Sequence, residues 1–269
     1  MYPFGYTRAA SLDQAVAMLT GKDDVKVLAG GMSLLPTMKL RLARPQQLVD
    51  LKGLGSLSFI EAKDRWLEIG AMTTHHAVST SALVRETLPA LASLAGGIGD
   101  TQVRYRGTIG GSVANCDPAA DYPAAVLALN ATIITNRREI EADRFFLGLF
   151  ETALQPGEII TSFRFPFPTS AAYIKFANLA SRFAIVGVFL ARFEEEVRIA
   201  VTGAADHVFR LSTHEAALTE RFDVAAIEAL PIEKEGLIAD VHATSSYRAH
   251  LIGILTQRAA AQAGAAHDL

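Results

Sequence analysis

Cysteine is nearly missing from this chain of 269 residues, in which Cys116 is the only one. A single thiol excludes an internal disulfide bond, and it excludes an iron–sulfur cluster or zinc site held by cysteines of this chain. An excess of positive charge is missing too, because the formal net charge is −3. The charge balance therefore gives no reason to expect binding to nucleic acid or to an anionic membrane surface.

Long apolar runs are also absent, and none approaches the ~20 residues that a membrane-spanning helix needs. The N-terminal sequence MYPFGYTRAASLDQAV has no basic stretch followed by an apolar one, so it does not resemble a secretory signal. We therefore expect a soluble, cytoplasmic protein without a membrane span. Half of the residues are hydrophobic, which is enough for a substantial core in one large or two medium domains.

Common nucleotide-binding and hydrolase motifs are missing as well. No GxGxxG lies between a strand and a helix, and the nearest approach, GLGSLS at residues 53–58, lacks the third glycine. Neither GxxxxGKS/T nor GxSxG occurs. These absences exclude a classical dinucleotide-binding unit, P-loop nucleotide hydrolysis and the usual serine-hydrolase site.

Two pairs of adjacent glycines in the chain are each followed closely by a serine. The first lies in VLAGGMSLL (residues 27–35) after a β-like run, and the second lies in TIGGS (residues 108–112). Glycine permits positive φ angles and close approach of the backbone to a ligand, and successive N–H groups in such a turn can bind an anion. Either pair alone is typical of an ordinary tight turn. Together, with hydroxyl residues at matching positions, they favour a ligand that carries two phosphates.

Segments around these glycines resemble one protein family: AGGMSLLPTMKLR (residues 29–41), IGAMTT (69–74) and QVRYRGTIGGSVANCDPAADYPA (102–124). They are similar to the FAD-binding medium subunits of the molybdenum hydroxylases, which include the carbon monoxide dehydrogenase medium chain and resemble the flavin domain of xanthine dehydrogenase. The resemblance continues through residues 173–191, 197–211 and 240–259, and so it covers essentially the whole chain.

The family resemblance implies an α+β fold in two domains. Residues 1–167 would form a PCMH-type FAD-binding domain, with a small βαβ subdomain and a larger mixed α/β subdomain. Residues 168–269 would form a C-terminal domain of the carbon monoxide dehydrogenase flavoprotein type, an antiparallel sheet with helices. Pro166 and Pro168 favour a boundary here, because prolines end strands and begin extended linkers.

Hydrophobic periodicity and capping signals predict the individual elements. Residues 11–14 are typical of a capping box that opens a short helix. The predicted strands are residues 25–28, 47–51, 57–60, 66–69, 131–135, 159–165, 172–177, 185–193 and 197–202. The predicted helices are residues 34–42 with Pro36 in the first turn, 83–94, 122–129 with Asp121 as cap, 212–220 and 246–262. The glutamates at 194–196 are predicted to form a hairpin turn.

The resemblance also implies which residues hold FAD. They are Leu28, Ala29, Gly30, Gly31, Met32, Ser33, Leu34 and Leu35 in the first motif, Thr108, Ile109, Gly110, Gly111 and Ser112 in the second, and Asn115, Asp117, Asp121, Lys175 and Phe183 beyond it. The two glycine motifs would wrap the pyrophosphate. No catalytic residue and no metal ligand are expected on this chain.

Three of these residues have a second interpretation. The Asp121 carboxylate would accept hydrogen bonds from ribose or ribityl hydroxyls, cap the following helix, or do both. Lys175 would contact the cofactor, as an aligned lysine of xanthine dehydrogenase does, or it would be a solvated lysine on a strand. Phe183 matches a tyrosine that shields the flavin ring in the carbon monoxide enzyme, and otherwise it would be a plain core aromatic.

The chain departs from the family pattern at several positions. Met32 stands where glutamine or histidine is common, so a polar side-chain contact is lost there. Arg182 replaces an aspartate, which would alter the field at the flavin ring or the docking of the large subunit. Cys116 is expected to be a small buried thiol. His75 and His76 have no third ligand at coordinating spacing, so neither a metal site nor a covalent flavin link is expected.

The main functional prediction is an electron-transfer subunit. A large molybdopterin subunit would oxidise a substrate, iron–sulfur clusters of a small subunit would relay the electrons, and FAD on this chain would pass them to an external acceptor. The partners would form a heterotrimer, whose further dimerisation stays open. The alternative is a self-sufficient flavin oxidase or reductase, but the last ~100 residues hold no clear cluster of acids and bases for it. A nucleotide-binding regulatory module would leave Phe183 without a role.

Overall fold

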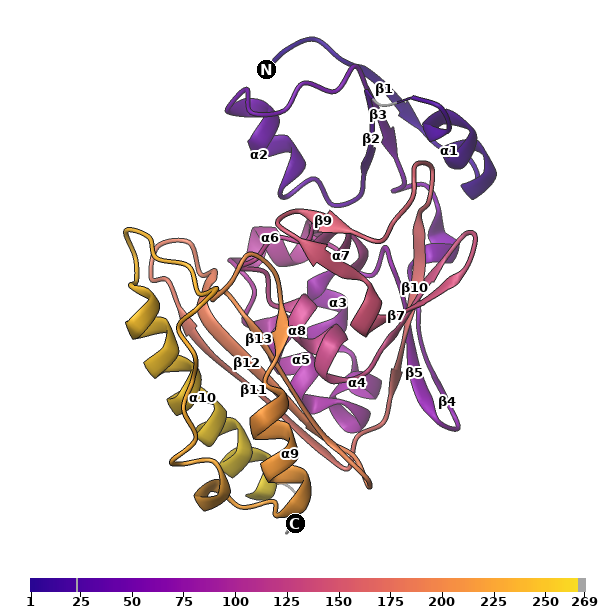
Figure 1. The fold of residues 1–269 in the computed structure, drawn as a ribbon. Coiled ribbons are helices and arrows are strands. Elements are labelled where there is room, and N and C mark those ends of the chain that lie inside the picture. The colour runs from indigo at the N-terminus through magenta and orange to yellow at the C-terminus, as the bar shows by residue number, and fades with distance from the viewer. Residues whose placement is uncertain (23, 266–269) are drawn as a thin grey trace.

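The computed structural model describes residues 1–22 and 24–265, and its N-terminal unit is a small parallel sheet with helices (Figure 1). The sheet has the order β1-β3-β2, so β3 pairs with both neighbours. The elements are β1 (Gly5–Arg8), α1 (Leu12–Leu19), β2 (Val25–Leu28), α2 (Leu34–Lys39) and β3 (Gln47–Asp50). The predicted capping box is confirmed, because the Ser11 hydroxyl accepts a hydrogen bond from the Gln14 amide at the start of α1.

The middle unit is built on a sheet with the order β4-β5-β10-β6-β7. Its strands are β4 (Ile60–Lys63), β5 (Trp66–Gly70), β6 (Thr132–Thr135), β7 (Glu139–Glu141) and β10 (Ile160–Pro166), and a hairpin adds β8 (Phe146–Gly148) and β9 (Glu151–Thr152). The helices of this unit are α3 (His75–Thr80), α4 (Ala82–Thr87), α5 (Pro89–Gly96), α6 (Thr101–Arg106), α7 (Ile109–Asn115) and α8 (Tyr122–Ala128). Short 3-10 turns lie at Gly55–Leu57 and Ala142–Arg144.

The C-terminal unit is an antiparallel sheet with the order β11-β12-β13-β14. Its elements are β11 (Ser170–Ala177), β12 (Ala184–Arg192), β13 (Val197–Thr202), β14 (Phe209–Arg210), α9 (Ser212–Glu220), a 3-10 turn at Val224–Ala226, and α10 (Ser245–Ala265). Helices α9 and α10 cover one face of this sheet, and α5 and α8 of the middle unit cover the other (Figure 1). The α+β fold class predicted from the sequence is confirmed.

Because helices cover both of its faces, the C-terminal sheet contributes to two hydrophobic cores. Val188 and Leu190 pack with residues of α9 and α10, whereas Phe189 and Ala191 join the core of the middle unit. Phe189 is fully buried there, and burying a side chain of this size stabilises a fold by about 1.5–3 kcal/mol. The middle unit therefore depends on the C-terminal sheet to complete its own core.

Two element predictions were wrong, and each error has a local cause. In place of the predicted strand at residues 57–60 there is a 3-10 turn followed by β4, because pairing with β5 begins only at Ile60. In place of one helix at residues 83–94 there are α4 and α5. Leu88 separates them with φ −141 and ψ 63, since the residue before a proline disfavours helical geometry and Pro89 follows.

Candidate functional site

The first glycine motif forms an open loop between β2 and α2. Gly31 has φ 75, a left-handed conformation that favours glycine, and Ser33 is the N-cap residue of α2. Within the described part of the chain, the N–H groups of residues 30–33 donate to no protein acceptor, and the Ser33 side chain does not cap the helix. Free backbone N–H groups at the start of a helix can bind a phosphate. The prediction of a glycine turn with free donors is confirmed for this motif.

Contact with the second motif fixes the position of this loop. A Cβ atom on Gly30 would collide with the Arg106 carbonyl oxygen, and it would lie 2.8 Å from the Gly107 Cα. A Cβ atom on Gly111 would lie 3.4 Å from the Ala29 Cβ. The two glycine motifs are far apart in sequence, and the tertiary structure brings them side by side.

The second motif is the start of helix α7 and not a glycine turn with positive φ angles. Neither Gly110 nor Gly111 has a positive φ, and their N–H groups are used within the protein. The Gly110 N–H donates to the Ala71 carbonyl over 2.9 Å, and the Gly111 N–H donates to the Thr108 hydroxyl over 3.1 Å. The Ile109 N–H donates to a carbonyl of the same IGAMTT segment. The predicted turn with positive φ angles is therefore not formed at the second motif, because Thr108 caps a helix there, and contact of residues 108–112 with the pyrophosphate stays a prediction.

Helix α7 instead presents a small polar face. Gly110 is buried, whereas Gly111, Ser112 and Asn115 are partly exposed. Positions three and four apart on a helix share a face, so Asn115 lies on the same side as Gly111 and Ser112, and Gly111 is the residue of this face that lies close to Ala29. This face offers a hydroxyl and an amide beside the free N–H groups of the first loop.

The loop after α7 is attached to the C-terminal sheet. The Thr202 hydroxyl on β13 donates to the Pro118 carbonyl over 2.8 Å. The Ala184 amide at the start of β12 donates to the Ala119 carbonyl over 3.3 Å. Because Ala184 follows Phe183 directly, the residues after the second motif and Phe183 are neighbours in the fold.

Asp121 is buried at the start of α8, but its carboxylate does not cap the helix. The carboxylate accepts a hydrogen bond from the Tyr173 hydroxyl over 2.5 Å and pairs with the Lys175 ammonium over 2.9 Å. Asp121 is thus the N-cap residue of α8 by position, as predicted, but the interpretation that its side chain caps the helix was wrong. Burial raises the pKa of the Asp121 carboxyl, and the positive charge of Lys175 opposes that rise. Burial also raises the pKa of Tyr173 well above its ordinary value, so the phenol stays protonated and donates a hydrogen bond to the Asp121 carboxylate.

Lys175 uses its N–H donors inside the protein. Besides its pairing with Asp121, its ammonium donates to the Gly97 carbonyl over 2.9 Å and to the Arg182 carbonyl over 3.1 Å. The side chain is 11% exposed, so the interpretation as a solvated strand lysine was wrong. An ammonium group has three N–H donors, and three acceptors already surround this one.

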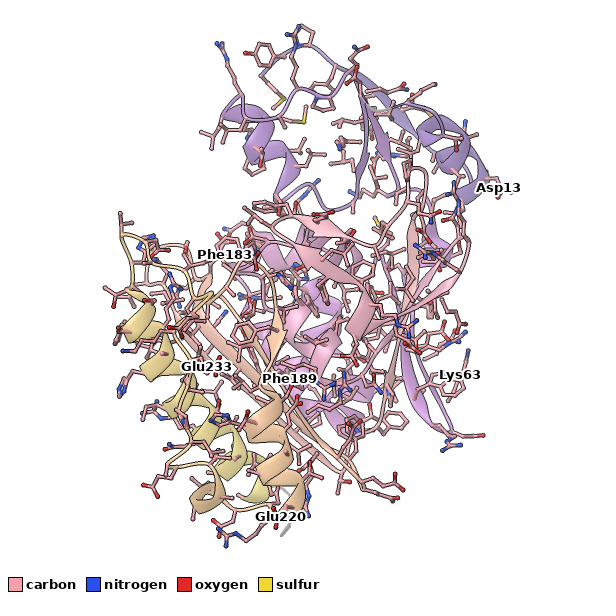
Figure 2. The ribbon with its side chains drawn as sticks, viewed as in Figure 1. Asp13, Lys63, Phe183, Phe189, Glu220 and Glu233 are labelled. Carbon is pink, nitrogen blue, oxygen red and sulfur yellow. The ribbon has the colours of Figure 1, made fainter. Side chains whose placement is uncertain are left out.

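Phe183 lies at the end of the hairpin between β11 and β12. Figure 2 shows it at the end of the C-terminal sheet that is nearer to the N-terminal unit, with Phe189 farther along the sheet. Phe183 is 46% exposed. The interpretation as a plain core aromatic was therefore wrong, and a large part of its surface is free to cover a ligand.

Sequence reasoning missed Tyr173 and the backbone carbonyls that complete this site. Tyr173 lies two residues before Lys175 on β11, and alternation along a strand puts both side chains on one face. That spacing places Tyr173 beside Lys175, but it does not identify Asp121 as the partner of either side chain. Gly97 and Arg106 contribute only backbone oxygen atoms, and such contacts leave no signal in the residue type.

Cys116 and His75 lie near the site with buried side chains. Cys116 ends α7 with φ 46, and burial raises the pKa of its thiol to about 11, which agrees with the predicted buried thiol. Burial, and then the positive charge of Arg104, lower the pKa of His75 to about 4, so that this imidazole is neutral at pH 7. His76 instead stacks on Tyr105, with ring centroids 3.9 Å apart.

Comparison with known proteins decides the family. Residues 2–168 match the family model described as the FAD binding domain in molybdopterin dehydrogenase. The chain belongs to this family of FAD-binding subunits. It is 33% identical to the glyceraldehyde dehydrogenase medium chain of Sulfolobus acidocaldarius, over 96% of this chain and 98% of the relative. It is 34% identical to the carbon monoxide dehydrogenase medium chain of Hydrogenophaga pseudoflava, over 95% of each. It is also 36% identical to the nicotine 6-hydroxylase medium subunit of Paenarthrobacter nicotinovorans, over 97% of each.

Two solved structures have the same fold. Carbon monoxide dehydrogenase from Hydrogenophaga pseudoflava, in a form that lacks the Mo-pyranopterin moiety, superposes with a TM-score of 0.90 at 34% identity, covering 98% of this chain and 99% of that one. Quinoline 2-oxidoreductase from Pseudomonas putida 86 gives a TM-score of 0.89 at 27% identity, covering 99% and 98%. This FAD-binding subunit is accordingly an oxidoreductase flavoprotein with FAD as its cofactor. Among the described residues, no helix is long and apolar enough to cross a membrane.

Proposed function

We propose that this chain is the electron-transfer subunit of a multi-subunit molybdenum hydroxylase, taking electrons from a partner's iron–sulfur clusters and passing them to an external acceptor. The observation that carries the proposal is the first loop, whose free N–H groups at residues 30–33 are fixed beside α7. FAD, when bound, supplies a centre that accepts electrons singly and passes on a pair. The residues of this chain bind and orient that cofactor.

The residues at the site fit a cofactor with a diphosphate and sugar hydroxyls. The N–H groups of residues 30–33, at the start of α2, would donate to the phosphates. Ser112 and Asn115 line the adjoining face of α7 and would add side-chain donors. Asp117 and Asp121 would accept hydrogen bonds from ribose or ribityl hydroxyls. The proposed contact set is residues 28–35, residues 108–112, Asn115, Asp117, Asp121 and Phe183.

Phe183 would cover the flavin ring in this proposal. Phe183 is about half exposed, and it precedes Ala184, whose N–H donates a hydrogen bond to the loop after α7. An aromatic ring that packs on the flavin would exclude water from that face, and offset stacking of aromatic rings contributes about 0.5–1.5 kcal/mol beyond the area it buries.

The proposed partners are a small subunit with iron–sulfur clusters and a large subunit with molybdopterin, together a heterotrimer. Cys116 is the only cysteine of this chain, which supports clusters on another chain. The relatives named above are medium chains or medium subunits. A division into domains at residues 1–167 and 168–269, and a cytoplasmic location, belong to the same proposal.

The alternative of a self-sufficient flavin oxidase or reductase has less support. Such an enzyme needs a free acid or base beside the flavin to move a substrate proton. The buried carboxylate of Asp121, the phenol of Tyr173 and the ammonium of Lys175 are bonded to one another. Each of these groups is therefore paired inside the protein and is not a free acid or base, although the Asp121 carboxylate keeps acceptor sites for a cofactor hydroxyl.

An anaerobic titration tests the proposed function. The FAD-loaded chain alone should keep an oxidised flavin when it is mixed with a substrate that bleaches the flavin of the complete complex. Adding the iron–sulfur and molybdenum subunits should then bleach it. Dithionite is the control, because it should reduce the flavin of the lone chain directly. Bleaching by substrate without partners would contradict the proposal and favour the self-sufficient enzyme.

A further inference from the structure

The ammonium of Lys175 connects three segments that are far apart in sequence. It bonds to the Gly97 carbonyl after α5, to the Asp121 carboxylate before α8, and to the Arg182 carbonyl in the β11–β12 hairpin. We infer that Lys175 is a positioning residue that holds the hairpin, and with it Phe183, at a fixed place over the flavin. This inference rests on the proposed function, in which Phe183 covers the ring.

Burial makes this arrangement costly to break. The Lys175 side chain is 11% exposed and the Asp121 side chain 5% exposed. Removing one partner of a buried ion pair leaves the other charge uncompensated, which costs more than losing an exposed pair. The three acceptors also match the three donors of an ammonium group, so the cluster is complete without a ligand.

The hairpin itself explains why an external support is needed. Arg182 has φ 65, a left-handed conformation that is unfavourable for a residue with a side chain, and Phe183 follows it directly. Within the hairpin, the Asn178 amide donates to the Phe183 carbonyl over 2.8 Å and the Arg182 amide donates to the Asn178 carbonyl over 2.9 Å. The bond from Lys175 to the Arg182 carbonyl joins this turn to the middle unit, because the same ammonium is bonded to Gly97 and Asp121.

A direct phosphate contact by Lys175 is the competing role. It would require the ammonium to leave the Gly97 or Arg182 carbonyl, or the carboxylate of Asp121. The two roles differ in what they predict for a double variant. A positioning residue acts through Phe183, whereas a residue that contacts the cofactor acts on FAD whether or not Phe183 is present.

The test uses the FAD-loaded full chain with Lys175→Met, Phe183→Ala and the two changes combined. Flavin fluorescence and the rate of reoxidation by ferricyanide should rise in each single variant, and the combined variant should match Phe183→Ala alone. Hydrogen exchange of the amides of Asn178 and Arg182 in Lys175→Met should be faster by about tenfold or more, since hydrogen bonds from a charged donor are lost. Lys26→Met, which changes an exposed lysine of β2, is the matched control and should change nothing.

Each contrary result identifies what is wrong. If Phe183→Ala changes the flavin but Lys175→Met does not, the positioning role is wrong and the proposed function stands. If the two effects add in the combined variant, Lys175 acts on FAD directly and the inference is overturned. If neither single variant changes the flavin, the role of Phe183 is wrong and the inference falls with it. If Lys175→Met does not fold, Asp121→Asn with Lys175→Met removes both charges, and its amide exchange decides the same question.

Discussion

At the scale of single residues, His75 shows how burial controls a titratable group. Its side chain is 4% exposed, and its Nδ1 has no hydrogen-bond partner in the part of the chain that the structure describes. Burial, with a smaller contribution from Arg104, lowers its pKa from 6.5 to about 4. The unfolded chain therefore takes up a proton here at a higher pH than the folded chain does, and stability depends on pH.

This difference predicts a loss of stability in mild acid. The contribution of His75 is fully present above pH 6.5 and is lost as the pH falls toward the folded-state pKa of about 4. Between pH 7.5 and pH 5 the free energy of unfolding should fall by about 2 kcal/mol through this residue. Urea unfolding of the chain and of His75→Asn at several pH values measures it, because the variant should lack this part of the pH dependence.

His76→Asn is the control for the neighbouring histidine. His76 stacks on Tyr105 and is only partly buried, so this variant shows what the same substitution does outside the buried position. Equal losses of stability in the chain and in His75→Asn would show that His75 is not the group responsible.

At the scale of elements, the site depends on how the first loop packs against the junction of α6 and α7. Gly30 has no room for a side chain, because a Cβ atom would meet the backbone of Arg106 and Gly107. The glycine is needed here for close packing and not for a special φ angle, which only Gly31 of this pair adopts. The free N–H groups of the loop are therefore held in place by contact between two backbones.

We predict that Gly30→Ala will lose FAD while the rest of the fold remains. Forcing an added methyl group into a packed contact costs about 1–3 kcal/mol, and the loop would relieve the clash by moving away from α7. The affinity for FAD should then fall by at least about tenfold, the factor that corresponds to 1.4 kcal/mol. The ratio of flavin absorbance to protein absorbance after gel filtration measures this loss.

Gly55→Ala provides a matched control for the same substitution. A Cβ atom on Gly55 meets no atom within 4 Å, so this variant should keep its FAD. Full FAD occupancy in Gly30→Ala would mean that the first loop does not bind the cofactor as proposed. Unfolding of Gly30→Ala, seen as lost secondary structure, would show that the contact supports the whole middle unit.

At the scale of the whole molecule, the C-terminal sheet completes both the core and the site. Phe189 and Ala200 belong to the core of the middle unit. Thr202 and Ala184 bond to the loop after α7. Residues 2–168, which match the family model, therefore have a hydrophobic core that also needs residues of the C-terminal sheet.

We predict that the fragment 1–167 will not bind FAD as a stable monomer. Without the C-terminal sheet, the apolar side of α8 would be exposed to water, and large exposed apolar patches promote association. Gel filtration and flavin absorbance of the fragment measure the outcome, and coexpression of residues 168–269 should restore binding. A monodisperse fragment with one FAD per chain would contradict this prediction.

The sequence by itself determined the elements that depend on local patterns. The βαβ order of the N-terminal unit, the strand β13 and the helix α9 have the predicted positions, because periodicity and turn residues act over a few neighbours. The free donors of the first loop also follow from local sequence, since Gly31 permits the positive φ that opens the turn. The family could be recognised for the same reason, because its motifs are contiguous.

Only the tertiary structure decided the roles of the second motif, Asp121 and Lys175. The local sequence allowed either a turn or a helix at Gly110 and Gly111. The helix is favoured because the Gly110 N–H bonds to a carbonyl of a distant segment and the Gly111 N–H bonds to the Thr108 hydroxyl. Asp121 and Lys175 find their partners across segments that no local pattern connects. A buried polar group must bond to whichever partner the fold brings within reach, and sequence spacing does not specify that partner.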